Sequence, residues 1–350
     1  MNYLSRIAMI ASTLGLFALI ADFGFNQNSF YQEVFDGFYF IVLGFGIIST
    51  IARYVAKKRV PTKSVFTFDL VSIGFSLWVF YLYLFVGVPF ETDLMLENPI
   101  WVQIAVVLTF IREFSELRIN YKRTVLNPAQ LFVSSFVLII LFGTFLLMTP
   151  RATVGGLSFI DALFTSTSAV CVTGLIVVDT GSYFTDFGQL VILFLIQIGG
   201  LGILTFASYF SYFFKGVSTY ENQLALSDMT NSNKLGEVFS TIKSILLITF
   251  GIELISTVLI YSSLDSTLFP SEPRKIFFAV FHAVSAFCNA GFSTLPNGLY
   301  EMGFRYNYLL QFVIILTFVM GGLGFPIVNN IIIFLKYKLR ALVSFGRFKP

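Results

Sequence analysis

Two segments of the sequence share residues that suit a cation path lined by backbone oxygen atoms. Residues 164–174 read FTSTSAVCVTG and residues 281–291 read FHAVSAFCNAG, and at an offset of 117 positions they are identical at five of eleven. The last four residues of each segment include no acidic side chain. A cation held there takes its ligands from backbone carbonyl groups, which can replace a hydration shell. The absence of carboxylates favours a monovalent cation over calcium.

Each segment ends in a glycine, Gly174 or Gly291, whose missing Cβ permits backbone conformations closed to other residues. A short helix that enters a membrane halfway, followed by an extended polar loop, turns carbonyl groups toward a central axis. The C-terminus of such a helix carries about half a negative charge and attracts a cation. The segments are therefore predicted to be re-entrant loops that bind a cation. The alternative is a pair of structural hairpins without an ion, which the duplication of the whole motif disfavours.

Composition indicates that these segments lie in a membrane protein. Of the 350 residues, 56% are hydrophobic and 12% are charged, about half the charged share of a soluble domain. A net charge of +3 spread over the chain argues against a nucleic-acid partner. One histidine and two cysteines are too few for a four-ligand zinc site, so we expect no transition-metal site. No P-loop, GxSxG or HExxH motif occurs, and we do not expect an enzyme.

Apolar runs of about 20 residues mark membrane-spanning helices. We predict spans near residues 4–21, 34–56, 66–88, 99–115, 130–148, 184–214, 238–262 and 306–335. Two apolar stretches, 157–170 and 275–287, are too short to cross and are predicted to be the re-entrant helices. Basic residues gather after the second span, after the fourth span and at the end of the chain, whereas the alternate loops are acidic. The positive-inside rule then predicts a cytoplasmic N-terminus.

The two loop segments belong to an internal repeat. Each copy reads as outer span, short helix, polar loop and long inner span with the motif GGLG, at 199–202 and 321–324. Glycine weakens a helix and permits a hinge, but small residues also let membrane helices pack closely. We prefer packing and keep a hinge or gate as the alternative for the glycines of both motifs, Gly199, Gly200, Gly202, Gly321, Gly322 and Gly324.

At these motifs the chain resembles the Trk/Ktr/HKT superfamily of potassium-translocating subunits. The resemblance covers roughly residues 126–350 and rests on LNPAQ, SAVCVTGL, VVDTGSYF, QIGGLG and SAFCNAGF. It implies a pore of four repeats, arranged like the subunits of a potassium channel, with one filter glycine in each repeat, here Gly174 and Gly291. It also implies that the ion is bound by the backbone before each glycine, at Cys171, Val172 and Thr173 in the first loop and at Cys288, Asn289 and Ala290 in the second.

The resemblance also implies partners. The superfamily forms homodimers and binds a cytoplasmic nucleotide-binding regulatory subunit, so both are expected here. The transported ion is K+, with Na+ as a further candidate, and we expect no covalently bound cofactor. The implied location is the cell membrane, with the lipid bilayer around a multi-pass chain.

The chain departs from the superfamily pattern in two ways. It holds two repeats, at 126–236 and 237–350, and we expect a part of a longer four-repeat protein; the alternative is that two copies combine. It also carries an extension at 1–125, predicted to be a separate four-span bundle. That bundle faintly resembles a voltage-sensor domain. Its fourth span offers only Arg112 and Arg118, however, whereas a sensor needs several charges, so we prefer a packing or regulatory role.

Three further polar features stand out. His282, opposite Thr165 in the repeat, is predicted to be a hydrogen-bonded structural histidine rather than a pH sensor. Glu253 lies in the middle of the seventh span, and we give structural and functional interpretations of this intramembrane acid equal weight. The polar segment 218–236 is predicted to be a cytoplasmic connector with a short helix, and is a candidate docking surface for the regulatory subunit.

These observations predict an all-α, polytopic transmembrane protein. A four-helix bundle is followed by repeats of outer helix, pore helix and inner helix, like the pore of a potassium channel. The predicted function is potassium uptake through a carbonyl-lined selectivity filter, by a channel or by ion-coupled transport. Two alternatives stay open from the sequence: an alternating-access transporter for another small solute, and a membrane-embedded sensor.

Overall fold

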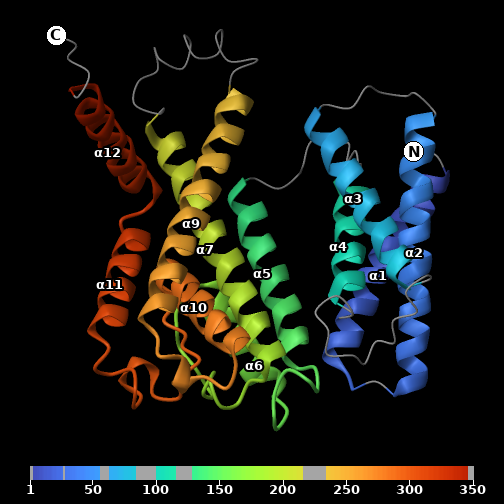
Figure 1. Cartoon of the computed structure of the whole chain (residues 1–350), viewed down its shortest axis with the longest axis horizontal. Coiled ribbons are helices and arrows are strands. Elements are labelled where there is room, and N and C mark those ends of the chain that lie inside the picture. Colours follow the sequence, from blue (N-terminus) through green and yellow to red (C-terminus); the bar gives the residue numbers. More distant parts are fainter. Residues whose placement is uncertain are drawn as a thin grey trace. The chain divides into compact units, whose positions relative to one another are not determined.

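The computed structural model describes residues 3–26, 28–55, 63–83, 100–115, 128–215 and 234–345. Within these ranges the elements are helices, joined by loops that hold one isolated β-bridge between Thr153 and Phe184. The prediction of an all-α protein is therefore confirmed. By its contacts the chain divides into two compact units, residues 1–125 and 126–350 (Figure 1).

The described part of the N-terminal unit is a helical bundle. Its helices are α1 (Tyr3–Gly24), α2 (Ser29–Val55), α3 (Lys63–Tyr81) and α4 (Ile100–Ser115). Tyr39, Leu43 and Val106 lie in a continuous buried core. Trp78 and Trp101 pack against this core, with their ring centroids 5.7 Å apart. The bundle therefore has a core of its own.

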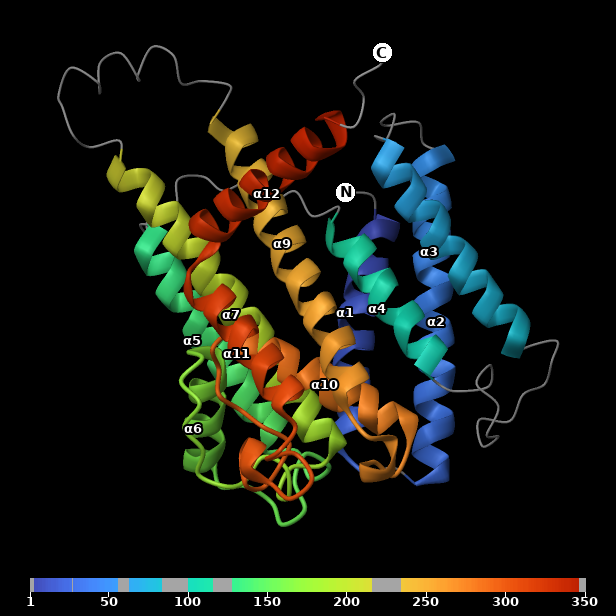
Figure 2. The ribbon, with the colours of Figure 1, turned by 60° about the vertical axis from the view of Figure 1, so that its left-hand side comes forward.

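The second unit contains both repeats. The first comprises α5 (Pro128–Leu147), α6 (Phe159–Val170) and α7 (Asp186–Lys215). The second comprises α9 (Lys234–Ser263), α10 (Glu272–Phe287), α11 (Tyr308–Gly322) and α12 (Phe325–Phe345), with 3-10 turns at Ser266–Leu268 and Gly298–Tyr300. Figure 2 shows the short helices α6 and α10 beside one end of the long helices, where the connecting loops also gather. In each repeat a short helix, α6 or α10, follows the outer helix and precedes the inner one, and the inner part of the second repeat is divided into α11 and α12.

Length and hydropathy identify several of these helices as membrane spans. Four described helices are long and apolar enough to cross, at Leu4–Gly24, Phe30–Val55, Asp186–Ile203 and Ile242–Ser263. A fifth crossing results if the bent pair α11 and α12 counts as one. Shorter apolar helices lie at Val65–Tyr81, Phe132–Leu147 and Phe159–Val170. Large apolar side chains such as Phe17, Leu138 and Leu254 point outward, 60% or more exposed, as expected of faces that meet lipid. The chain is a multi-pass membrane protein.

The last inner helix differs from its prediction as one span over 306–335. α11 ends at Gly322, α12 begins at Phe325, and the two helices are bent by 110° (Figure 2). Gly324 has φ +77°, a conformation that favours glycine and does not continue a helix. Pro326 follows at the start of α12, where its missing N–H costs nothing and where it cannot extend the preceding helix. The apolar sequence therefore continues across a position where the helix is broken.

Several predictions fall outside the described residues. These are the acidic loop around 91–97, the basic residues at 57–59 and 118–123, and most of the connector 218–236. The basic end of the chain at 347–349 also lies outside them. The orientation of the chain therefore stays a prediction.

Candidate ion-binding site

The first loop is anchored by helix α6. Ser158 caps its N-terminus by accepting a hydrogen bond from the N–H of Asp161, and the Asp161 carboxylate lies in the first turn, where a negative charge is favourable. Ser166 donates to the carbonyl oxygen of Ile140 at 2.8 Å, which fixes α6 against α5. The helix ends at Val170, so its C-terminal carbonyl groups lie at the start of the loop.

The two loops have the same backbone conformation. Val172 and Asn289 have φ of +50° and +59°, and Gly174 and Gly291 have φ of +79° and +73°. In the first loop the N–H groups of Cys171, Val172 and Thr173 donate to the carbonyls of Thr167, Ala169 and Ser168 at 2.8, 3.2 and 2.8 Å. In the second loop those of Cys288, Asn289 and Ala290 donate to Val284, Ala286 and Ser285 at 2.9, 2.9 and 2.8 Å. Every pair is related by 117 positions, so the repeat extends to the hydrogen bonds of the backbone.

The structure brings the two loops into contact. A Cβ atom at Gly174 would overlap the carbonyl oxygen of Ala290, and it would lie 3.3 Å from the Cα of Gly291. A second contact follows further along, where a Cβ at Gly181 would overlap the carbonyl oxygen of Thr294. Position 174 therefore requires glycine for two reasons: its φ is positive, and the neighbouring loop leaves no room for a Cβ atom. All eight residues predicted to bind the ion lie on these two touching loops.

The loops combine buried and exposed positions. Cys171 and Thr173 are exposed in the first loop, and Asn289 and Gly291 are exposed in the second. Cys288, by contrast, is buried. Among the described residues, no three His, Cys, Asp or Glu side chains group closely enough to hold a metal ion.

The first glycine of each GGLG motif lies against the C-terminal end of a short helix. A Cβ at Gly199 would overlap the carbonyl oxygen of Val170, the last residue of α6. A Cβ at Gly321 would overlap the carbonyl oxygen of Phe287, the last residue of α10. The backbone of each inner helix thus contacts the C-terminus of the short helix in the same repeat. This geometry favours packing over a hinge for Gly199 and Gly321.

The other glycines of the motifs have separate neighbours. Gly200 lies against the side chain of Cys288, where a Cβ would be 2.9 Å from the Cβ of that cysteine. Gly202 lies against the ring of Phe136, and Gly322 lies near the side chain of Asn289. Gly324, with its positive φ, forms the break after α11. Helix α7 therefore contacts the ends of both short helices, its own through Gly199 and that of the next repeat through Gly200.

Replacing Gly199 by alanine is expected to destabilise the second unit. The added methyl meets backbone atoms of Val170 that cannot rotate away, and overpacking of this kind costs about 1–3 kcal/mol. Gly251→Ala is the matched control, because Gly251 also lies in a long helix and a Cβ there has no neighbour within 4 Å among the described residues. Thermal unfolding of the full chain in detergent compares the two variants. Equal midpoints would contradict the packing role of Gly199.

The second loop is braced by side chains of α10. Ser285 donates to the carbonyl oxygen of Phe292 at 2.7 Å. The imidazole of His282 contacts the carbonyl oxygen of Phe278 and the hydroxyl of Ser293, each at 2.9 Å. His282 is hydrogen-bonded through both ring nitrogens, as predicted for a structural histidine. Ser293 was not predicted from the sequence, where its position two residues after Gly291 is the available signal.

The first loop lacks this bracing. Thr165 and Ser168 correspond to His282 and Ser285, and their buried hydroxyls have no hydrogen-bond partner among the described residues. The residues after Gly174, from Leu175 to Val177, are about half exposed or more. The two loops thus have the same backbone conformation, but side-chain hydrogen bonds from the short helix brace the second loop and not the first.

Glu253 has a partner that the sequence did not indicate. The side-chain nitrogen of Gln197, two residues before the first GGLG motif, donates to both carboxylate oxygens at 3.1 and 3.3 Å. Glu253 is 5% exposed, and its bond to Gln197 joins α9 to α7 across the two repeats. This contact supports a structural role for the acid.

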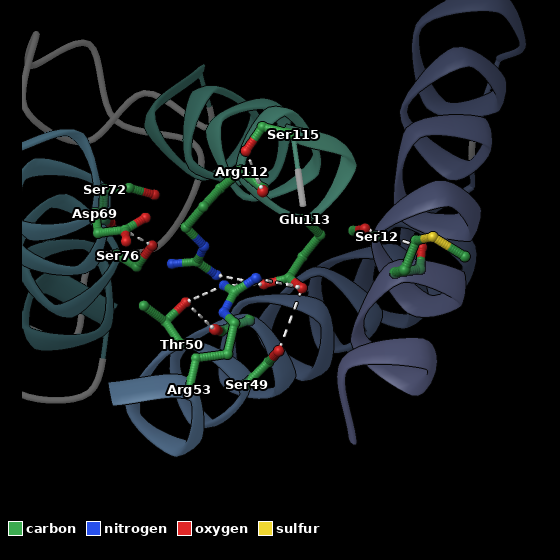
Figure 3. A network of polar contacts seen from close by, with 12 residues as sticks. Ser12, Ser49, Thr50, Arg53, Asp69, Ser72, Ser76, Arg112, Glu113 and Ser115 are labelled. Atoms are coloured by element: carbon green, nitrogen blue, oxygen red, sulfur yellow. Dashed lines mark hydrogen bonds and ion pairs between the residues drawn. The ribbon is translucent and has the colours of Figure 1, made fainter. Parts of the chain in front are cut away.

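A second polar cluster lies inside the N-terminal bundle (Figure 3). Glu113, 1% exposed, forms ion pairs with Arg53 at 3.0 Å and with Arg112 at 3.3 Å, and it accepts a hydrogen bond from Ser49 at 3.2 Å. Arg112 is equally buried, and Figure 3 shows Asp69 beside its guanidinium. The arginine that a voltage sensor would have to move is therefore paired and enclosed.

Known proteins resemble this chain over the part that holds the loops. Residues 98–347 match the TrkH family, described as a cation transport protein. The Ktr system potassium uptake protein B of Bacillus subtilis (strain 168) is 40% identical over 207 residues, which covers 59% of this chain and 45% of that protein. The potassium/sodium uptake protein NtpJ of Enterococcus hirae is 36% identical over 224 residues, or 63% of this chain and 48% of that protein. The Ktr system potassium uptake protein B of Vibrio alginolyticus is 33% identical over 202 residues, which covers 58% of this chain and 44% of that protein.

The chain spans a little under half the length of these relatives. The family match covers 250 of the 350 residues and includes both loops and both GGLG motifs. It confirms the resemblance to potassium-translocating subunits that the motifs indicated. The chain therefore belongs to the TrkH family of cation transport proteins.

Proposed function

We propose that this chain contributes two loops to a path for K+ uptake across the cell membrane. The observation that carries the proposal is the pair of loops, identical in φ pattern and hydrogen bonding, that meet at Gly174 and Ala290. Relatives named as potassium uptake proteins support K+ as the ion. Na+ is a second candidate ion, because one relative is named as a potassium/sodium uptake protein.

The selectivity comes from backbone carbonyls of residues 171–173 and 288–290. Carbonyl oxygens replace the hydration shell of a monovalent cation without a carboxylate. The short helices α6 and α10 end at the two loops, and the partial negative charge of a helix C-terminus adds to the attraction. The repeats at 126–236 and 237–350 then act as equivalent parts of one filter.

The resemblance to the family supports the remaining assignments except the orientation, which rests on the positive-inside rule. The protein forms a homodimer in the cell membrane, with its N-terminus in the cytoplasm, and a cytoplasmic nucleotide-binding subunit regulates it. Relatives that are named as components of a Ktr system support a partner of this kind. The N-terminal bundle has a packing or regulatory role.

Radioactive rubidium tests the proposed transport. The chain, assembled with the further repeats that complete its filter, is reconstituted into K+-loaded liposomes, and uptake of ⁸⁶Rb+ is compared with uptake into protein-free liposomes. We expect protein-dependent uptake that external K+ suppresses and that choline does not. Uptake equal to that of protein-free liposomes, or uptake that K+ leaves unchanged, would contradict the proposal.

A further inference from the structure

The two inner helices carry the same glycine motif but have different shapes. Helix α7 continues without a break through Gly199–Gly202 to Lys215, whereas α11 ends at Gly322 and the chain turns by 110° into α12. The break occurs at Gly324, which has a positive φ, and at Pro326. The first repeat has a glycine at the position of Gly324, Gly202, but it has Leu204 at the position of Pro326. These two residues explain why the helix stops. They leave open what holds the end of α11 in place, since a helix that stops leaves carbonyl groups without a partner.

The side chain of Asn289 lies at this helix end. With the amide oriented so that both of its groups are satisfied, the nitrogen donates to the carbonyl oxygen of Phe318 at 3.2 Å. The amide oxygen accepts from the N–H of Gly322 at 3.1 Å. These two backbone groups lie four residues apart in the last turn of α11, which ends at Gly322. One side chain of the filter loop therefore holds the last turn of α11.

The first repeat lacks this connection. Val172 occupies the position of Asn289 in the first loop, with a nearly equal φ of +50°, and its side chain has no hydrogen-bonding group. The groups in α7 that correspond to Phe318 and Gly322 belong to Ile196 and Gly200, inside an unbroken helix. The amide thus occurs in the repeat whose inner helix is broken, and valine occurs in the repeat whose inner helix is continuous.

We propose that Asn289 is a positioning residue that couples the second loop to the bend between α11 and α12. The loop backbone at Asn289 and the last turn of α11 then move together, so that the direction of α12 depends on the conformation of the loop. This rests on the proposed function in one respect: an ion bound at the loop then changes the α11–α12 angle, and a change in that angle alters ion binding.

Replacing Asn289 by valine separates the two elements. Valine is compatible with the loop, because Val172 adopts the same backbone in the first repeat. The variant loses both hydrogen bonds to α11, and two such bonds shift the equilibrium between the bent and other arrangements on the order of tenfold. Val172→Asn is the matched control: it places the same amide in the first loop, beside a helix that is not broken.

The distance between the two helices can be measured by pulsed electron paramagnetic resonance on the full chain. Spin labels at Phe312→Cys in α11 and Phe334→Cys in α12 occupy exposed positions, 57% and 56% accessible. The exposed Cys171 is replaced by serine, and the parent without added cysteines measures labelling of the buried Cys288. We expect a narrow distance distribution without K+, and a broad or displaced one in the Asn289→Val variant. Without K+, the distance distribution of the Val172→Asn variant should match that of the parent.

The outcomes separate this inference from the proposed function. An unchanged distance distribution in the Asn289→Val variant, with monodisperse and folded protein, would overturn the coupling. With K+ added, the distribution of the parent is expected to shift, and that of Asn289→Val is expected to stay the same. An equal K+ response in both proteins would also overturn it. If K+ neither stabilises the parent against heat nor shifts its distances, the proposed function fails, while the comparison without K+ still decides the role of Asn289.

Discussion

Gly174→Ala is expected to abolish K+-selective binding by this chain. The new Cβ overlaps the carbonyl oxygen of Ala290 on the neighbouring loop, and alanine is also strained at φ +79°. Displacement of the loop and backbone strain together cost on the order of 3 kcal/mol, which corresponds to about a hundredfold in affinity. Equilibrium binding of ⁸⁶Rb+ to the purified full chain, with K+ and Na+ as competitors, measures the effect.

Two other glycines provide controls for Gly174→Ala. Gly156 has the same φ of +79°, but a Cβ there has no neighbour within 4 Å in the described part of the chain, so Gly156→Ala reproduces the strain without the overlap. For Gly291, at φ +73°, the one described atom within 4 Å of a Cβ is the Cα of Gly174, at 3.6 Å, and we expect an intermediate loss from Gly291→Ala. Equal Rb+ affinities in the Gly174→Ala and Gly156→Ala variants would contradict a filter at the contact between the loops.

Glu113→Ala is expected to unfold much of the N-terminal bundle. The substitution leaves Arg112, which is 1% exposed, without its carboxylate partner and removes the acceptor for Ser49 and Arg53. Removing one partner of a buried ion pair costs about 3–5 kcal/mol, because the remaining charge is uncompensated. Tryptophan fluorescence during thermal unfolding in detergent reports on this unit alone, because both tryptophans of the chain, Trp78 and Trp101, pack on its core.

Two variants separate the charge of Glu113 from its other contacts. Glu113→Gln keeps an oxygen that accepts from Ser49 but removes the charge, so we expect a smaller loss than in Glu113→Ala. Glu33→Ala removes an acid from an exposed position of α2, where charges contribute at most about 1 kcal/mol. If Glu113→Ala unfolds at the same temperature as Glu33→Ala, the buried network does not stabilise the bundle.

The arrangement of helices and loops was largely predictable from the sequence. The apolar stretch 157–170 corresponds to α6 at Phe159–Val170, and 275–287 corresponds to most of α10 at Glu272–Phe287. Both predictions rest on length, because an apolar helix of 12 or 16 residues is shorter than the roughly 20 that a crossing needs. The offset of 117 positions also predicted equivalent loops, and their φ values and hydrogen bonds agree residue by residue.

Contacts between distant residues were not predictable in the same way. The GGLG motif predicts close packing, but the choice of Val170 and Phe287 as its neighbours depends on how the helices cross. Glu113 adjoins Arg112 in the sequence, where consecutive side chains of a helix point in different directions. Their pairing depends on α2, which supplies Ser49 and Arg53. The break at Gly322 was missed because apolarity continues across it, although the Gly-Phe-Pro sequence at 324–326 carries the signal.

The position of a bound Rb+ ion tests the central claim most directly. Crystals of the full chain grown with RbCl give an anomalous difference map that locates the ion without reference to transport. We predict a peak where the two loops meet, beside the carbonyls of residues 171–173 and 288–290, and its loss in the Gly174→Ala variant. A map with no peak at the loops, or with its strongest peak elsewhere, such as at the Glu253 carboxylate, would contradict the account.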